Sequence, residues 1–132
     1  MSTEPSIFTR IINREIPAEI IYEDEFCIVI PDKFPSQAGQ LLVIPKAQIA
    51  YIADLDETTY QHTMAIVKKC MHALDKALGT VRTCVVIEGF EVPHVHVRLY
   101  PCQTAELNLD SRHEASDADL AALAAALRPH LS

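Results

Sequence analysis

The amino-acid sequence predicts an α+β fold: a five-stranded antiparallel sheet with one long helix and short helices toward the ends of the chain. Five short runs of mainly β-branched and aromatic residues follow one another, mostly with short connections, which is typical of antiparallel strands. One segment, residues 57–78, has the periodicity of a helix instead. This combination indicates helices packed on one side of the sheet.

The first third of the chain predicts a short helix and a hairpin. Ser6 is a suitable N-cap for a helix over residues 6–13, whose apolar side chains share one face. The runs AEIIY and FCIVIP, residues 18–22 and 26–31, predict two strands around an acidic three-residue loop. After a loop rich in proline, serine and glycine, the run QLLVIP at 40–45 predicts the third strand.

The long helix is predicted from Glu57 to Leu78, with Gly79 at its expected end. Its apolar residues step by four and three, which predicts one continuous stripe of core side chains. They are Tyr60, Met64, Val67, Met71, Leu74 and Leu78. His62 and His72 have no partner at helical spacing, and we expect structural or solvated roles for both.

The last third predicts two strands, at 82–88 and 94–100, followed by an irregular linker. A final helix is expected to begin after the N-cap Ser116 and to end near Pro129, which cannot continue it.

Length and composition limit the function. The 132 residues predict one domain, with a core at about 6–101 and a C-terminal linker and helix at 102–132. A net charge of −7 disfavours binding to duplex nucleic acid. No apolar run reaches the length of a membrane span and the start MSTEPS lacks a signal pattern, so we expect a cytoplasmic protein without a membrane partner. The four scattered cysteines are expected to be reduced thiols.

The stretch EVPHVHVRLYP, residues 91–101, places His94, His96 and Arg98 on one face of a predicted strand. Three interpretations are open. In the first, these three side chains form the solvated face of an amphipathic strand. In the second, the histidines form a metal site, although Arg98 cannot ligate a cation and would repel it. In the third, a neutral imidazole attacks phosphorus while the guanidinium binds the phosphate oxygens. The residue types suit phosphate better than metal.

These residues resemble the signature of the histidine triad (HIT) nucleotide-binding proteins, His-x-His-x-His followed by two apolar residues. The resemblance covers about residues 6–101. Similar segments are IFTRIINREIPAEIIYEDEFCIVIPD at 7–32, LLVIPKAQI at 41–49 and EGFEVPHVHVRLYP at 88–101. It implies a single HIT-like domain with a five-stranded antiparallel sheet, a purine nucleotide such as AMP or GMP as the small-molecule partner, and a homodimer.

The resemblance also implies roles for individual residues. His96 matches the nucleophile that becomes nucleotidylated, and His94 matches the first triad member, which orients it. Asp32 matches the acidic residue that accepts hydrogen bonds from the ribose hydroxyls. Glu91 stands where many members have a serine or threonine that contacts phosphate. Four residues match the apolar walls around the base, although Ile11 and Ile30 fit a core role equally well: Ile7, Phe8, Ile11 and Ile30.

The chain departs from the family pattern at several positions. Arg98 replaces the third histidine; we expect it to stabilise phosphate but not to pass a proton readily to a leaving group. Gln40 stands where another histidine of the pocket is usual. Ser6 and Thr9 stand where some relatives carry a zinc-binding cysteine pair, so we expect neither a metal nor another cofactor.

The sequence therefore predicts a hydrolase or transferase that acts at a nucleoside-phosphate bond through a covalent nucleotidyl-His96 intermediate, with His94 and Arg98 in the catalytic set. Nucleoside phosphoramidates, dinucleoside polyphosphates and adenylylated conjugates are candidate substrates, and nucleotidyl transfer is a candidate reaction. The alternative is a noncatalytic nucleotide-binding or regulatory protein that lost efficient turnover through Gln40 and Arg98.

Overall fold

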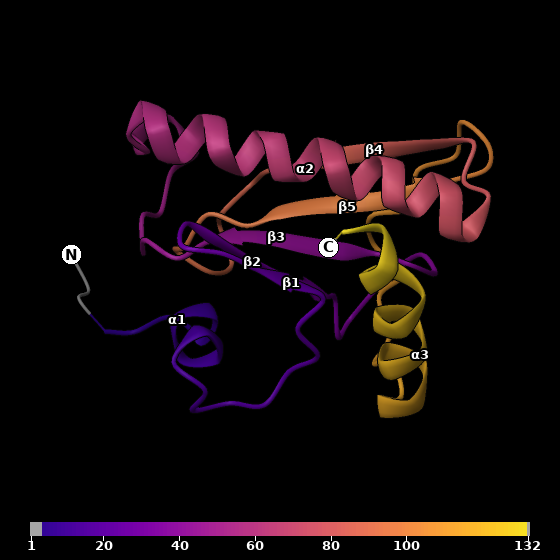
Figure 1. Ribbon diagram of the computed structural model, residues 1–132, viewed down its shortest axis with the longest axis horizontal. Helices are drawn as coiled ribbons and strands as arrows, with labels where there is room; N and C mark the ends of the chain where they lie inside the picture. Colours follow the sequence, from indigo (N-terminus) through magenta and orange to yellow (C-terminus); the bar gives the residue numbers. More distant parts are fainter. Residues whose placement is uncertain (1–3, 132) are drawn as a thin grey trace.

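The computed structural model describes residues 4–131, in which a five-stranded sheet forms the centre of the molecule (Figure 1). Its strands are β1 (Tyr22–Glu23), β2 (Cys27–Pro31), β3 (Leu41–Pro45), β4 (Arg82–Val86) and β5 (Val97–Cys102). They lie in the order β1-β2-β3-β5-β4, and every neighbouring pair is antiparallel. The predicted fold class is confirmed, although β1 is shorter than the run at 18–22 suggested.

The helices are α1 (Ile7–Ile12), η1 (Ile52–Asp54), α2 (Glu57–Leu78), α3 (Asp117–Leu127) and η2 (Arg128–His130). Helices α1 and α3 begin at the capping residues expected from the sequence, Ser6 and Ser116. The side chains of Ser6 and Ser116 accept hydrogen bonds from the backbone three residues later, which satisfies free N–H groups of α1 and α3. Gly79 ends α2 in the left-handed region, at φ 66°.

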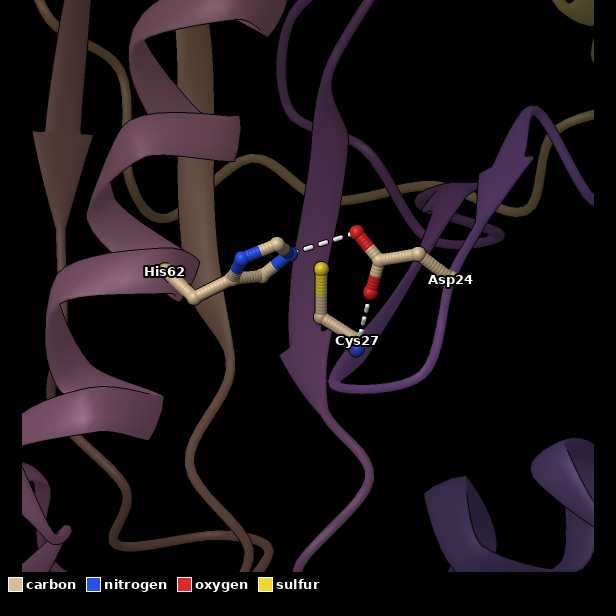
Figure 2. A group of neighbouring side chains, drawn as sticks. All are labelled: Asp24, Cys27 and His62. Atoms are coloured by element: carbon tan, nitrogen blue, oxygen red, sulfur yellow. Dashed lines mark hydrogen bonds and ion pairs between the residues drawn. The ribbon is translucent and has the colours of Figure 1, made fainter.

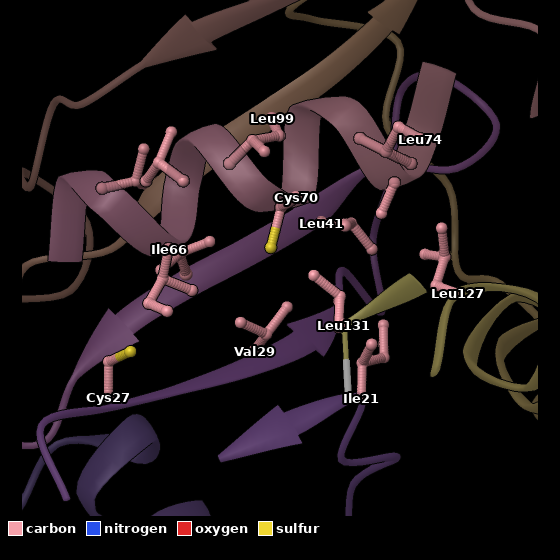
Figure 3. Close-up of a cluster of buried hydrophobic side chains, with 14 of the residues drawn as sticks. Ile21, Cys27, Val29, Leu41, Ile66, Cys70, Leu74, Leu99, Leu127 and Leu131 are labelled. Carbon is pink, nitrogen blue, oxygen red and sulfur yellow. The ribbon is translucent and has the colours of Figure 1, made fainter. Parts of the chain in front are cut away.

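Alternate residues of β2 and β3 enter two separate apolar cores. Val29 and Leu41 pack with Leu74 of α2 and with the end of the chain (Figure 3). Ile30 and Leu42 point to the opposite face and pack with α1. The prediction of helices on one side is therefore wrong, because α1 covers the second face. The uninterrupted apolar runs of β2 and β3, buried at every position, are the pattern that burial on both faces produces.

The apolar stripe predicted for α2 is right at its centre and wrong at its ends. Val67 and Leu74 are buried, whereas Tyr60 and Leu78 are 40% and 39% exposed. The buried face consists of Thr63, Ile66, Val67, Cys70, Ala73 and Leu74. Small residues such as Ala73 lie on this buried face, whereas the large side chains at the two ends of the predicted stripe are partly exposed.

Strand β5 begins at Val97, later than predicted. The backbone N–H of His94 donates to the carbonyl of Val92 at 2.8 Å, and that of Val95 donates to the carbonyl of Ile49 at 2.7 Å. His94 and His96 therefore lie in the turn that leads into β5 rather than in the strand ladder.

The linker between β5 and α3 runs beside the loop that follows β2. The N–H of Ala115 donates to the carbonyl of Lys33 at 2.9 Å, and the N–H of His113 donates to the carbonyl of Pro35 at 3.2 Å. These bonds hold the linker near the face of β5 that carries Arg98.

Among residues 4–131, no helix is long and apolar enough to cross a membrane. Residues 1–3, which belong to the start that was searched for a signal pattern, lie outside the described part of the chain. None of the four cysteines forms a disulfide, and Cys27, Cys70 and Cys102 are buried.

Candidate active site

His94 is buried and held by hydrogen bonds on both ring nitrogens. Its Nε2 lies 2.7 Å from the carbonyl oxygen of Pro45 and must donate to it. Nδ1 of the neutral ring is then an acceptor, and the hydroxyl of Ser6 donates to it at 2.7 Å. Because the Ser6 oxygen also accepts from the Thr9 N–H at 3.1 Å, the cap of α1 is tied directly to His94.

Gln48 completes this network. Its Oε1 accepts from the Thr9 hydroxyl at 2.6 Å and from the Ser6 N–H at 2.7 Å. At the positions where some relatives carry a zinc-binding cysteine pair, this chain thus has a set of protein hydrogen bonds. Gln48 was not predicted from the sequence, because it lies far from Ser6 along the chain and meets it only through folding.

His96 is 1% exposed, so the interpretation of the motif as a solvated strand face is wrong. Its Nδ1 donates to the carbonyl oxygen of His94 at 2.8 Å, which leaves a lone pair on Nε2. Burial lowers the pKa of His96 below its ordinary 6.5, and the nearby Arg98 charge lowers it further. The ring is therefore neutral near pH 7, as a nucleophile must be.

Glu88 and Arg98 lie around the free nitrogen of His96. Oε1 of Glu88 is 3.8 Å from Nε2 of His96 and 3.8 Å from Nη2 of Arg98. Within residues 4–131, three buried atoms here have no hydrogen-bond partner: His96 Nε2, Glu88 Oε1 and Arg98 Nε. Unsatisfied buried polar atoms cost about 1–3 kcal/mol each, so their convergence is typical of a site that binds a polar ligand.

Glu88 was not among the residues predicted from the sequence. Glu88 lies two residues after Val86, the last residue of β4, just as Val86 lies two residues after Cys84. Val86 pairs with Arg98. Successive alternate residues of a strand share one face, so this register could have placed Glu88 beside Arg98 had the pairing of β4 with β5 been known.

A pocket of about 340 Å³ opens next to these groups. Its lining residues come from β4, β5, the turn between them and the C-terminal linker: Val86, Glu88, Glu91, Arg98, Tyr100, Leu109, Asp110 and Arg112. Arg112 donates to Oε1 of Glu91 at 2.8 Å, and Arg98 lies 3.7 Å from the other Glu91 oxygen. The hydrogen bond from Arg112 lowers the pKa of Glu91, which is therefore a carboxylate between two guanidinium groups.

The other predicted ligand residues lie toward α1 and the loop after β2. Asp32 is buried, and its Oδ2 accepts from Nε2 of Gln40 at 2.6 Å. Gln40 in turn accepts from the Ser36 N–H at 2.9 Å, so it braces this loop. Of the four predicted wall residues only Ile7 is exposed; Phe8, Ile11 and Ile30 are buried in the core under α1. The ring of Phe8 lies 4.8 Å from that of His96.

A second polar cluster, Asp24, Cys27 and His62, lies on the other face of the sheet (Figure 2). His62, for which a structural or solvated role was expected, has a structural one, because its Nε2 is hydrogen-bonded to Oδ2 of Asp24. The same carboxylate accepts from the Tyr22 hydroxyl at 2.7 Å and from the Cys27 N–H at 2.9 Å. Burial raises the pKa of the Cys27 thiol to about 12, so it is not a thiolate near pH 7. The cluster joins the β1–β2 hairpin to α2.

The fold and the buried histidine pair define a small α+β protein whose two histidines lie beside a pocket lined by Glu88 and Arg98. The HIT domain family matches residues 13–104, and the chain belongs to the histidine triad family. An uncharacterised HIT-like protein of Synechococcus elongatus is 34% identical over 102 residues, which are 74% of this chain and 90% of that protein.

Two solved structures are also similar. A Hit-like protein involved in cell-cycle regulation from Bartonella henselae has a TM-score of 0.88 and 26% identity, covering 99% of this chain and 100% of that one. A hypothetical histidine triad nucleotide-binding protein from Sulfolobus tokodaii has a TM-score of 0.84 and 26% identity, covering 94% and 90%. The resemblance recognised in the sequence is confirmed.

Proposed function

We propose that this protein binds a purine nucleotide and acts at its α-phosphorus through a covalent nucleotidyl-His96 intermediate. The observation that carries the proposal is the state of His96: its Nδ1 donates to the His94 carbonyl, and its Nε2 has no hydrogen-bond partner among the described residues. A buried, neutral imidazole with a free lone pair is a prepared nucleophile.

In the proposed reaction Nε2 forms a bond to phosphorus, and the leaving group departs with the electron pair of its own bond. Nδ1 keeps its proton, which stays hydrogen-bonded to the His94 carbonyl oxygen. This oxygen stabilises the positive charge that the ring acquires. Arg98 is placed to contact the nonbridging phosphate oxygens. Water then displaces the histidine and releases a nucleoside monophosphate.

The nucleoside part is proposed to lie toward α1. Asp32 accepts hydrogen bonds from the ribose hydroxyls, and Gln40 holds its carboxylate. The base packs near Ile7 and the α1 core that contains Phe8, Ile11 and Ile30. Support comes from the family and from the position of Phe8 against His96. The nucleotide-binding description of the Sulfolobus relative is consistent with this ligand.

The test is trapping of the intermediate. The protein is mixed with adenosine or guanosine 5′-phosphoramidate, quenched at millisecond to second times and weighed intact. We expect a nucleotidyl adduct that is absent from His96→Ala and retained in His72→Ala, a matched change at an exposed histidine. Tight binding of AMP or GMP by the wild type without any adduct or turnover would favour the noncatalytic alternative.

We further propose a homodimer in the cytoplasm. Strand β4 is an edge of the described sheet, and Val81 and Val85 beside that edge are 68% and 36% exposed, which favours association of copies. Light scattering of the purified protein tests the dimer, with Val85→Lys expected to shift it toward monomer. Cell fractionation tests the location.

A further inference from the structure

Glu88 lies beside His96 in a fixed orientation. Its Oε2 accepts from the backbone N–H of Phe90 at 2.7 Å, which anchors one end of the carboxylate. The other oxygen, Oε1, is buried and lies 3.8 Å from Nε2 of His96. The carboxylate thus points its unpaired oxygen toward the atom that would carry the nucleotidyl group.

The turn that carries Glu88 is itself constrained. Gly89 has φ 71°, in the left-handed region that glycine adopts without cost. A Cβ at this position would lie 3.0 Å from the carbonyl oxygen of Ala50, closer than side-chain atoms normally approach backbone. The backbone therefore holds the Phe90 N–H, and through it the Glu88 carboxylate, in place.

Glu88 is also open to solvent on its pocket side. Its side chain is 27% exposed and lines the pocket of about 340 Å³, so water can reach the carboxylate while Oε1 stays directed at His96. Arg98 lies 3.8 Å from the same oxygen. Charged groups that face Glu88 from the linker and the turn are Glu91, Asp110 and Arg112.

We propose that Glu88 is the proton acceptor for the water that hydrolyses the nucleotidyl-His96 intermediate, a role that rests on the proposed function above. Glu88 takes one proton from the water, and the water oxygen forms a bond to phosphorus. The bond between phosphorus and Nε2 breaks, and its electron pair returns to the ring. The products are a nucleoside monophosphate, neutral His96 with its Nδ1 proton unchanged, and a Glu88 carboxylic acid that loses its proton to solvent.

This role fits the departure of the chain from its family. Arg98 cannot accept a proton from water at neutral pH. Within residues 4–131, the acceptor next to His96 that has no hydrogen-bond partner is Oε1 of Glu88. Positioned general bases contribute about 10²–10⁴-fold to a proton-transfer step.

The experiment separates the two halves of the reaction with p-nitrophenyl esters of AMP and GMP, because p-nitrophenolate leaves without needing a proton. In Glu88→Gln the amide oxygen can still accept from the Phe90 N–H, so the hydrogen bond that anchors this side chain is kept. We expect a burst of about one p-nitrophenolate per protein, then release at least about 100-fold slower than in wild type, with the adduct on His96 accumulating by intact mass. Glu25→Gln, at an exposed carboxylate in the hairpin loop, is the matched control and should behave as wild type.

Fluoride distinguishes a proton-accepting role of Glu88 from a merely structural one. It attacks phosphorus without losing a proton, so it should restore turnover of Glu88→Gln and yield the nucleoside phosphorofluoridate. Equal loss of burst and steady rate without adduct, or unchanged kinetics in Glu88→Gln, would overturn the role of Glu88 while the wild-type adduct keeps the proposed function. Absence of both adduct and p-nitrophenolate from the wild type would overturn the proposed function and this role with it.

Discussion

The carbonyl oxygen of His94 accepts the Nδ1 proton of His96 at 2.8 Å, so the first histidine of the pair sets the tautomer of the second. His94 is itself held between the Pro45 carbonyl and the Ser6 hydroxyl. His96, the proposed nucleophile, is thus oriented by a chain of hydrogen bonds that begins at the cap of α1.

This chain predicts an unusually large effect of Ser6→Ala. The change removes a helix cap, worth about 1 kcal/mol, and leaves Nδ1 of His94 with only the Thr9 hydroxyl at 3.4 Å, which already donates to Gln48. Loss of the buried hydrogen bond from Ser6 costs about 1–3 kcal/mol more. Ser116→Ala removes the cap of α3 alone and should cost only about 1 kcal/mol. Urea unfolding of both variants checks the difference, and equal losses would mean that the bond to His94 contributes nothing.

The buried histidines predict loss of stability on mild acidification. Burial lowers the pKa values of His94 and His96 below the ordinary 6.5, so below that pH the unfolded chain binds more protons than the folded one. The free energy of unfolding should have its full value above about pH 7 and decrease as the pH drops toward 5. Urea midpoints across this range measure it. His72→Ala should keep the decline, and a flat profile in the wild type would contradict it.

Arg98→Lys should weaken nucleotide binding although the charge is kept. An ammonium cannot form the two parallel hydrogen bonds of a guanidinium with phosphate oxygens, and loss of one such bond corresponds to about tenfold in affinity. Calorimetric titration with AMP and GMP measures the change. An affinity equal to that of wild type would show that Arg98 does not contact the phosphate.

Glu91→Gln should strengthen nucleotide binding. The Glu91 carboxylate lies 3.7 Å from Arg98 and competes with a phosphate for the guanidinium. Neutralising it should raise AMP affinity several-fold at low salt, an effect that decreases as salt screens the charges. Weaker binding by Glu91→Gln would instead indicate that Glu91 contacts the ligand directly.

Asp24→Ala should destabilise the protein without changing the candidate site, which lies on the other face of the sheet. The change removes the acceptor that Tyr22 and His62 share and that links α2 to the β1–β2 hairpin. We expect the free energy of unfolding to fall by about 2–4 kcal/mol. Although burial raises the pKa of Asp24, hydrogen bonds from His62 and Tyr22 lower it more, to well below its usual range. Its stabilisation is therefore present above about pH 4 and lost at stronger acidity. Glu25→Ala, its exposed neighbour, is the control for unfolding experiments.

The sequence predicted the elements whose signals are local. Capping at Ser6 and Ser116, the end of α2 at Gly79 and the five strands follow from short patterns, and all are present. It failed where packing decides: α1 covers the second face of the sheet, and Tyr60 and Leu78 lie at the margin of the buried face of α2.

The site was predicted in the same partial way. His94, His96 and Arg98 were found because the motif is contiguous, and the structure places all three beside one another. Glu88, Gln48 and Arg112 reach them through the register of β4 on β5 and through loop contacts, which no single stretch of residues encodes. The partner of His62 was missed for the same reason, because Asp24 lies in another element.

The linker after β5 supplies part of the candidate site that the family match does not include. The match to the HIT domain ends at residue 104, whereas Leu109, Asp110 and Arg112 line the pocket. Backbone bonds to Lys33 and Pro35 fasten this segment to the loop that carries Asp32. Ligand choice can thus vary independently of the proposed chemistry. Substitutions at three positions outside the matched region can change which molecules fit the pocket, while His96, the proposed nucleophile, and its hydrogen-bond partners stay as they are.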